Sequence, residues 1–152
     1  MSDEELKIKI SDLLPAATFD EGGEWINVNV GVQDWLSFAK KLRHEETLFF
    51  DYLFCLTCID WITHLTMVYH FSSTKFRHNI VVKIKLDRNN PEIESVSKIW
   101  RTADFHEREV YEMFGVNFLN HPDLRLLILP DGWEGKNPMR KDFEDPINMI
   151  KL

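Results

Sequence analysis

The side chains best suited to chemistry gather between residues 104 and 123, where histidines and carboxylates lie close together. Several could bind a metal or act as general acids and bases: His106, Glu107, Glu109, His121 and Asp123. Their spacing matches no familiar zinc motif such as H-E-x-x-H, and on a helix His106 falls on a different face from Glu107. His121 precedes a proline and is more simply explained as a turn residue. An independent metal-dependent enzyme using His106, Glu107 and His121 is therefore a weak alternative.

The two cysteines, Cys55 and Cys58, form a lone C-x-x-C motif. The motif lies in an apolar, strand-like segment without glycine or proline, and residues three apart on a strand point to opposite faces. We therefore expect two small buried residues rather than a disulfide or a metal site. Two thiolates are also too few to hold an iron–sulfur cluster.

The sequence carries no phosphate-binding loop, dinucleotide fingerprint or G-x-S-x-G nucleophile motif. Its net charge of -7 argues against sequence-independent binding of nucleic acid. The tryptophans are more typical of core or interface anchors than of a cofactor cage: Trp25, Trp35, Trp61, Trp100 and Trp133.

A short helix is expected to position the histidine and carboxylate side chains. Thr102 can cap its first turn, and Gly115 can end it because glycine tolerates the left-handed conformation. Asp104 and Arg108 are spaced for an ion pair across one helical turn.

Glu107 is the unusual residue of this helix, because it shares a face with the apolar Val110 and Phe114. If that face is buried, the carboxylate needs a cationic partner, since an unpaired buried charge is strongly destabilising. The nearby candidates are Arg125, Arg140 and Lys141. Alternatively, Glu107 lies at the edge of the face and reaches water, and the sequence leaves both possibilities open.

The segment that follows the helix is rich in proline and still apolar. A proline recurs every eight residues, which excludes a long helix or a central strand: Pro122, Pro130, Pro138 and Pro146. So apolar a segment must lie against its own domain or in the groove of another protein. We expect burial of Leu129, Trp133, Met139 and Phe143, and pairing of Arg125, Arg140 and Lys141 with carboxylates. In the isolated chain we expect a mobile tail that orders on assembly.

These residues resemble the signature of the 30 kDa subunit family of respiratory complex I, known as the C subunit of NADH–quinone oxidoreductase. The matching positions are Glu107, Arg108, Glu109, Tyr111, Phe114, Gly115, His121, Pro122, Asp123, Leu124, Arg125, Pro130, Trp133, Gly135, Pro138, Arg140, Lys141 and Asp142. Leu126 departs from the family's pattern, which usually has a second arginine there, and Lys136-Asn137 makes the spacing before Pro138 one residue longer.

The resemblance implies a structural, docking subunit of the peripheral arm of proton-translocating NADH:quinone oxidoreductase, with the signature residues binding its partners. The implied partners are the D subunit, which helps form the quinone site, and the iron–sulfur B and I subunits. This chain would be non-catalytic and carry no cofactor, with iron–sulfur clusters, FMN, NADH and quinone on other subunits. It would lie at the cytoplasmic face of the bacterial inner membrane, or the equivalent organelle membrane, and reach the membrane only through the complex. An alternative is the equivalent subunit of a membrane-bound hydrogenase or a ferredoxin-fed photosynthetic complex.

The preceding residues are expected to form the platform for this segment. Helical patterns run from Ser2 to Pro15, with Ser2 and Glu5 as a capping box, over 35–43, and over 93–100 as a short helix. Strand patterns cover 26–32, 52–61, 65–71 and 80–86, and the apolar run over 52–61 is typical of a central strand covered on both sides.

The order of these elements predicts an α+β fold with an antiparallel sheet of about four strands packed with helices. We expect a globular domain over 1–115 and an extended, irregular tail over 116–152. The acidic N-terminus argues against a signal peptide, and the apolar run from Leu48 to Ile59 is too short to span a bilayer. The sequence therefore predicts a soluble or peripheral protein.

Overall fold

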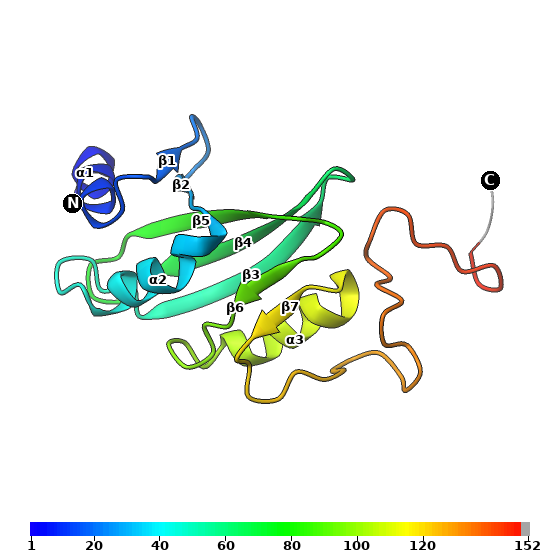
Figure 1. The fold of residues 1–152 in the computed structure, drawn as a ribbon. Helices are drawn as coiled ribbons and strands as arrows, with labels where there is room; N and C mark the ends of the chain where they lie inside the picture. Colours follow the sequence, from blue (N-terminus) through cyan, green and yellow to red (C-terminus); the bar gives the residue numbers. More distant parts are fainter. Residues whose placement is uncertain (150–152) are drawn as a thin grey trace.

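The computed structural model describes residues 1–149. A five-stranded sheet forms its centre, with strand order β1-β2-β5-β4-β3 (Figure 1). The strands span Thr18–Phe19 (β1), Ile26–Asn29 (β2), Tyr52–Asp60 (β3), Leu65–Ser72 (β4) and Asn79–Leu86 (β5). Neighbouring strands are antiparallel except β2 and β5, which are parallel. The predicted α+β class is confirmed. The sheet departs from the predicted antiparallel sheet of about four strands at the parallel pair β2–β5 and at the short β1, which is the strand of this sheet that the sequence pattern did not reveal.

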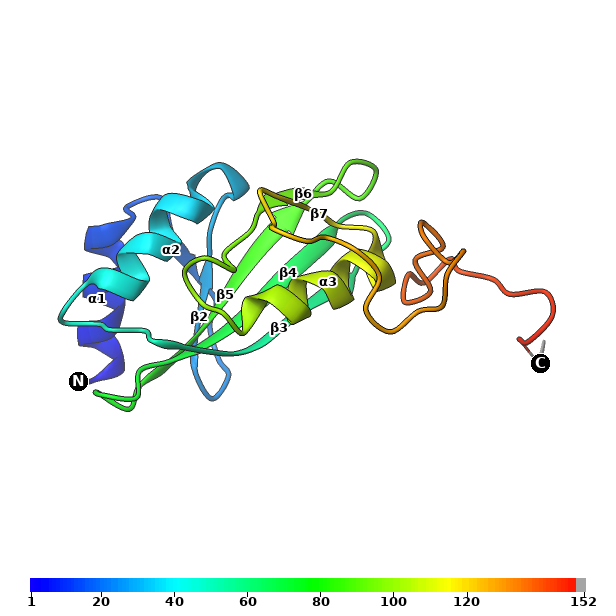
Figure 2. The same ribbon diagram turned by 90° about the horizontal axis from the view of Figure 1, so that it is seen from below.

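Helices cover one face of this sheet (Figure 1). They span Asp3–Leu13 (α1), Trp35–His44 (α2) and Ala103–Phe114 (α3), and a 3-10 turn precedes α2 at Val32–Asp34 (η1). The ring of Trp35 lies 4.5 Å from that of Tyr69, and the ring of Trp100 lies 4.6 Å from that of Phe71. The predicted capping box at Ser2 is present at the start of α1. This helix lies at the opposite end of the molecule from the tail (Figure 2).

A second, two-stranded parallel sheet joins β6 (Glu92–Glu94) to β7 (Asn117–Leu119). The short helix predicted over 93–100 is therefore wrong, because Ile93 is a strand residue paired with Phe118. This pairing joins segments distant in sequence, so no local pattern reveals it. The strand β7 also lies within the residues assigned to the tail, and the irregular segment begins only after Leu119.

The strand β3 lies at the edge of the sheet and not at its centre as predicted. Leu53 and Leu56 are buried on the side covered by helices, whereas Thr57 is exposed. A bulge follows Leu53, which the sequence pattern did not indicate. Cys58 is buried and Cys55 is half-buried beside the bulge, and both are free thiols.

The turn between β3 and β4 has an unusual backbone. Ile62 has a φ of 71°, in the left-handed region that β-branched residues rarely adopt. That conformation costs an ordinary residue roughly 1–2 kcal/mol. Trp61 and Ile62 are 52% and 62% exposed, so burial of these side chains does little to offset the strain.

Candidate functional site

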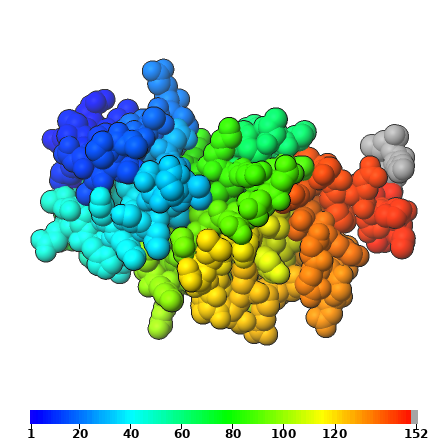
Figure 3. Space-filling view, viewed as in Figure 1, coloured from blue at the N-terminus to red at the C-terminus, as the bar shows by residue number. Residues whose placement is uncertain are grey.

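The tail runs along α3 and then reaches the tip of the β3–β4 hairpin, where the orange-red spheres of the tail touch the green spheres of the body (Figure 3). Residues 120–149 form no helix or strand. Their backbone is instead bound by buried charged side chains of the body, namely Arg108, Glu112 and Asp60. The site is therefore the surface formed jointly by α3, this hairpin and the tail.

Arg108 binds two carbonyl groups of the tail. Its Nε donates to the Arg125 carbonyl at 3.1 Å and its Nη2 donates to the Leu126 carbonyl at 2.7 Å. The predicted ion pair between Asp104 and Arg108 does not form, because the Asp104 carboxylate faces His121 at 3.1 Å. Arg108 of the signature therefore binds the chain's own backbone.

Glu112 lies one helical turn after Arg108 and is 2% exposed. Its carboxylate accepts hydrogen bonds from three consecutive amides, those of Leu127 at 2.9 Å, Ile128 at 3.0 Å and Leu129 at 3.2 Å. Sequence reasoning missed this residue because a glutamate four positions after an arginine is usually half of a solvated helix ion pair. Arg108 and Glu112 together bind the carbonyls and amides of one continuous stretch.

Asp60 holds the second part of the tail. Its carboxylate receives two hydrogen bonds from Arg88, at 2.9 and 2.8 Å, and one from the Lys141 amide at 2.9 Å. The hydrogen bonds from Arg88 hold the pKa of Asp60 well below its ordinary value, which outweighs the opposing effect of burial. Arg88 also pairs with Asp142 at 3.0 Å. The body and the tail therefore share one ion-pair cluster.

The C-terminal end of α3 provides a further attachment. Carbonyl groups in the last turn of a helix lack partners within the helix, and the tail supplies them: the Met139 amide donates to Met113 at 3.0 Å and the Arg140 Nε donates to Phe114 at 2.7 Å. Gly115 ends the helix with a φ of 78°, as predicted. A Cβ at Gly115 would lie 2.7 Å from the side chain of Asn137, so the tail also requires glycine here.

Glu107 is completely buried, but its partners are not the predicted cations. The Ser95 hydroxyl donates to its carboxylate at 2.6 Å and the Val96 amide donates at 2.8 Å. Burial raises the pKa of Glu107 to about 7, and these two hydrogen bonds only partly oppose the effect. Both predictions for Glu107, a cationic partner and contact with water, are wrong.

The side chain of His121 is buried beside Glu107. Its Nδ1 accepts a hydrogen bond from the Asp123 amide at 3.0 Å, which leaves the proton on Nε2. Nε2 lies 3.1 Å from the Asp104 carboxylate and 3.8 Å from that of Glu107. Among residues 1–149, no group of three or more histidine, cysteine or acidic side chains is arranged to hold a metal ion. Of the other residues proposed as ligands, Glu109 is exposed and His106 is half-buried.

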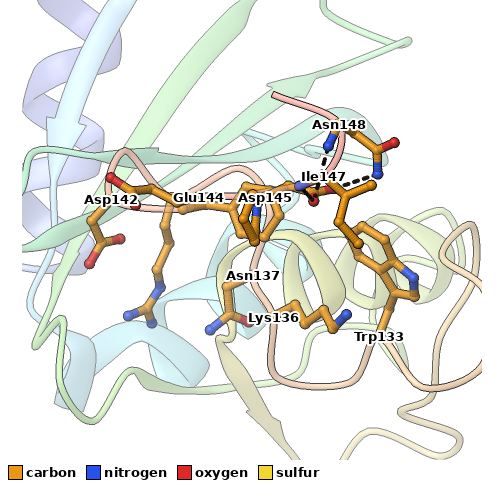
Figure 4. Close-up of a pocket in the computed structure, with 11 residues that line it drawn as sticks. Trp133, Lys136, Asn137, Asp142, Glu144, Asp145, Ile147 and Asn148 are labelled. Atoms are coloured by element: carbon orange, nitrogen blue, oxygen red, sulfur yellow. Dashed lines mark hydrogen bonds between the residues drawn. The ribbon is translucent and has the colours of Figure 1, made fainter. Parts of the chain in front are cut away.

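The end of the tail folds around an open hollow of about 580 Å³ (Figure 4). The rings of Trp133 and Phe143 lie 6.3 Å apart on its lining, and the Lys136 amine lies 4.5 Å from the centre of the Trp133 ring. Leu129, Trp133 and Phe143 are half-buried, whereas Met139 is 58% exposed, so this chain alone does not bury it. Arg125 pairs with Asp123 at 2.9 Å on the surface.

A model of the family described as respiratory-chain NADH dehydrogenase, 30 Kd subunit, matches residues 28–147. The chain belongs to this family. It is 42% identical over 115 residues to the NADH-quinone oxidoreductase C subunit of Chloroherpeton thalassium, which covers 74% of this chain and 48% of that protein. It is 35% identical over 139 residues to the C subunit of Chlorobium phaeobacteroides, and the match covers 90% of this chain and 82% of that protein. It is also 44% identical over 122 residues to the NADH-quinone oxidoreductase C/D subunit of Phocaeicola vulgatus, with 75% and 23% covered.

This 30 Kd subunit family member therefore spans about half the length of the first of these relatives and under a quarter of the C/D subunit. Two of the solved structures that share its fold are the following. A chain of the archaeal membrane-bound sulfane sulfur reductase superposes with a TM-score of 0.81 at 24% identity, covering 93% of this chain and 85% of that one. The trypsin-resistant fragment of Nqo5 superposes with a TM-score of 0.68 at 21% identity, covering 81% and 100%. Within residues 1–149, every helix is too short or too polar to cross a bilayer.

Proposed function

We propose that the chain is a docking subunit of NADH–quinone oxidoreductase and that α3 and the tail bind the D subunit. The observation that supports this most directly is a tail whose backbone is bound internally while several of its large apolar side chains face outward. Ile128 is 64% exposed and Met139 is 58% exposed, and Phe105 on α3 is 61% exposed. Large apolar side chains exposed on one element and on the segment bound to it are a feature of protein interaction surfaces.

The internal hydrogen bonds give this surface a defined shape before a partner arrives. Arg108 and Glu112 occupy the carbonyls and amides over 125–129, so those groups are not free to bind a partner. Docking would then depend on side chains, and its entropic cost would be lower than for a disordered tail. The expected mobility of the tail in the isolated chain stays a prediction, and the internal bonds argue for less of it over 125–129.

The D subunit is the partner favoured by the relatives, because those named for both the C and the D subunit combine the two in one polypeptide. Such a fusion tethers the two parts to each other, which supports contact between them. Contacts with the B and I subunits, the absence of a cofactor or catalytic residue on this chain, and a position on the cytoplasmic side of the membrane follow from the family resemblance. They are parts of the same proposal.

The second candidate is the same scaffold role in a different redox complex. The fold shared with the sulfane sulfur reductase chain supports it, but at 24% identity that likeness concerns the fold alone. Identities of 35–44% to NADH–quinone oxidoreductase subunits favour the first candidate.

Co-expression of the full chain with the D subunit from the same genome tests the proposal. We expect Ile128→Ser to weaken capture of the D subunit by at least about tenfold, as for a central interface residue. The matched control is Ile8→Ser, which alters an equally exposed isoleucine (61%) on α1 at the far end of the molecule. Equal capture by both variants and the wild type would refute docking through this surface.

A further inference from the structure

The tip of the β3–β4 hairpin presents two large apolar side chains to solvent. Trp61 is 52% exposed and its neighbour Ile62 is 62% exposed. The left-handed backbone at Ile62 suits asparagine or glycine far better than a β-branched residue. Isoleucine at this position therefore strains the backbone of the isolated chain, and its side chain is largely left in solvent.

The backbone of the tip is nevertheless held in place by hydrogen bonds to Asp60. Asp60 is 3% exposed. Its carboxylate accepts one hydrogen bond from the Ile62 amide at 2.8 Å and two from the Arg88 side chain. These contacts fix the backbone of the turn from which the two apolar side chains project. Apolar side chains on a preorganised turn are suited to anchor an interface, because less backbone freedom is lost when the turn binds.

The tip is also continuous with the tail. The carboxylate of Asp60 that accepts the Ile62 amide accepts the Lys141 amide as well, and the Lys141 amine lies 5.9 Å from the centre of the Trp61 ring. In the space-filling view the hairpin and the tail form one uninterrupted surface (Figure 3). Within residues 1–149, the Lys141 amine has no carboxylate within ion-pair distance.

We propose that Trp61 and Ile62 anchor a second contact with the subunit that binds the tail, by entering an apolar pocket whose rim carries a carboxylate opposite Lys141. This inference rests on the proposed docking function, because the partner is identified by continuity between the tip and the tail. Tryptophan is among the residues that most often dominate binding when buried in such a pocket. The Lys141 amine beside it has no carboxylate partner among residues 1–149, which is the reason for proposing an acidic rim.

Two substitutions separate binding from folding. Asparagine accepts the left-handed backbone, so the isolated Ile62→Asn chain should have an unchanged or higher midpoint of thermal unfolding. The same variant should bind the co-expressed, full-length D subunit several-fold more weakly, and Trp61→Ala at least about tenfold more weakly. Ile8→Asn on α1 is the matched control and should not change binding.

A purely structural role for the tip predicts the opposite combination, with altered unfolding and unchanged binding. If Ile128→Ser weakens binding while both tip variants bind normally, the anchor proposal fails and docking through the tail stands. If none of the three variants weakens binding, both proposals fail. The anchor proposal is also overturned if the tip variants change only self-association of the chain in sedimentation, or only its binding to anionic lipid vesicles.

Discussion

Glu112→Gln isolates the attachment between α3 and the tail. The substitution keeps the size of the side chain but replaces one carboxylate oxygen by an NH2 group, which donates hydrogen bonds and cannot accept them. In the native chain the carboxylate accepts three consecutive amides, from Leu127 to Leu129, at 2.9–3.2 Å. The variant must therefore leave at least one of these donors facing another donor.

The size of the effect follows from the exposure of the tail. A hydrogen bond to a charged group contributes about 1.5–3 kcal/mol when both partners are buried. Leu127 and Ile128 are 39% and 64% exposed, so their amides can turn to water and recover part of that loss. We expect the free energy of unfolding to fall by about 1–2 kcal/mol. Local opening over 127–129 should become about 2 kcal/mol easier, which is roughly 30-fold faster amide exchange.

Hydrogen exchange resolved by residue, together with urea unfolding, measures both quantities. The control is Glu109→Gln, an exposed glutamate one turn earlier on the same helix. Protection should fall over 127–129 in Glu112→Gln alone, while amides of β4 and β5 follow only the global change. If exchange over 127–129 is as slow in Glu112→Gln as in the wild type, the carboxylate does not hold the tail and the reasoning is refuted.

Two further predictions concern α3. The pKa of Glu107 is raised from 4.5 to about 7, so its contribution to stability is fully present below pH 4.5 and is lost as the pH rises through 7. Between pH 5 and 7 the wild type should lose about 1–2 kcal/mol of unfolding free energy that Glu107→Gln does not lose, and parallel pH profiles by urea unfolding would contradict this. Gly115→Ala should cost about 1–3 kcal/mol through its left-handed φ of 78° and its clash with Asn137. Adding Asn137→Gly, which removes the side chain and tolerates the left-handed φ of 49° at this position, should recover part of that loss in thermal unfolding. Strictly additive effects of the two substitutions would show that the clash contributes nothing.

Local patterns predicted the elements whose cause is local. The capping box at Ser2, the amphipathic α2 and the glycine end of α3 each depend on residues within one or two turns of each other. The helix face containing Glu107 was also sufficient to identify a charge that burial would perturb. The hydrogen-bond partners of Glu107 could not be predicted in this way. Ser95 and the Val96 amide belong to a segment whose spacing from α3 is not distinctive.

Long-range contacts to the backbone explain most of the differences between the predicted and the observed structure. The pairing of Ile93 with Phe118 converted a predicted helix into β6, and no periodicity within either segment reveals it. Glu112 and Asp60 act on main-chain amides of the tail, and every residue except proline offers such an amide. The sequence of the tail therefore carries no sign of which body residue will bind it.

Arg108 and Arg140 of the signature bind the chain's own backbone, and this changes how substitution of the signature's arginines must be interpreted. Arg140 was expected to pair with a carboxylate, but its Nε donates to the Phe114 carbonyl and links the tail to the end of α3. Loss of D subunit capture in Arg140→Ala would then report a displaced tail as readily as a lost intermolecular contact. Arg125 is exposed and its side chain pairs with its neighbour Asp123, so Arg125→Ala tests charge at the interface without moving the tail. A weak effect of Arg125→Ala beside a strong effect of Arg140→Ala would mean that the arginines of this segment shape the surface, and that its apolar side chains bind the partner.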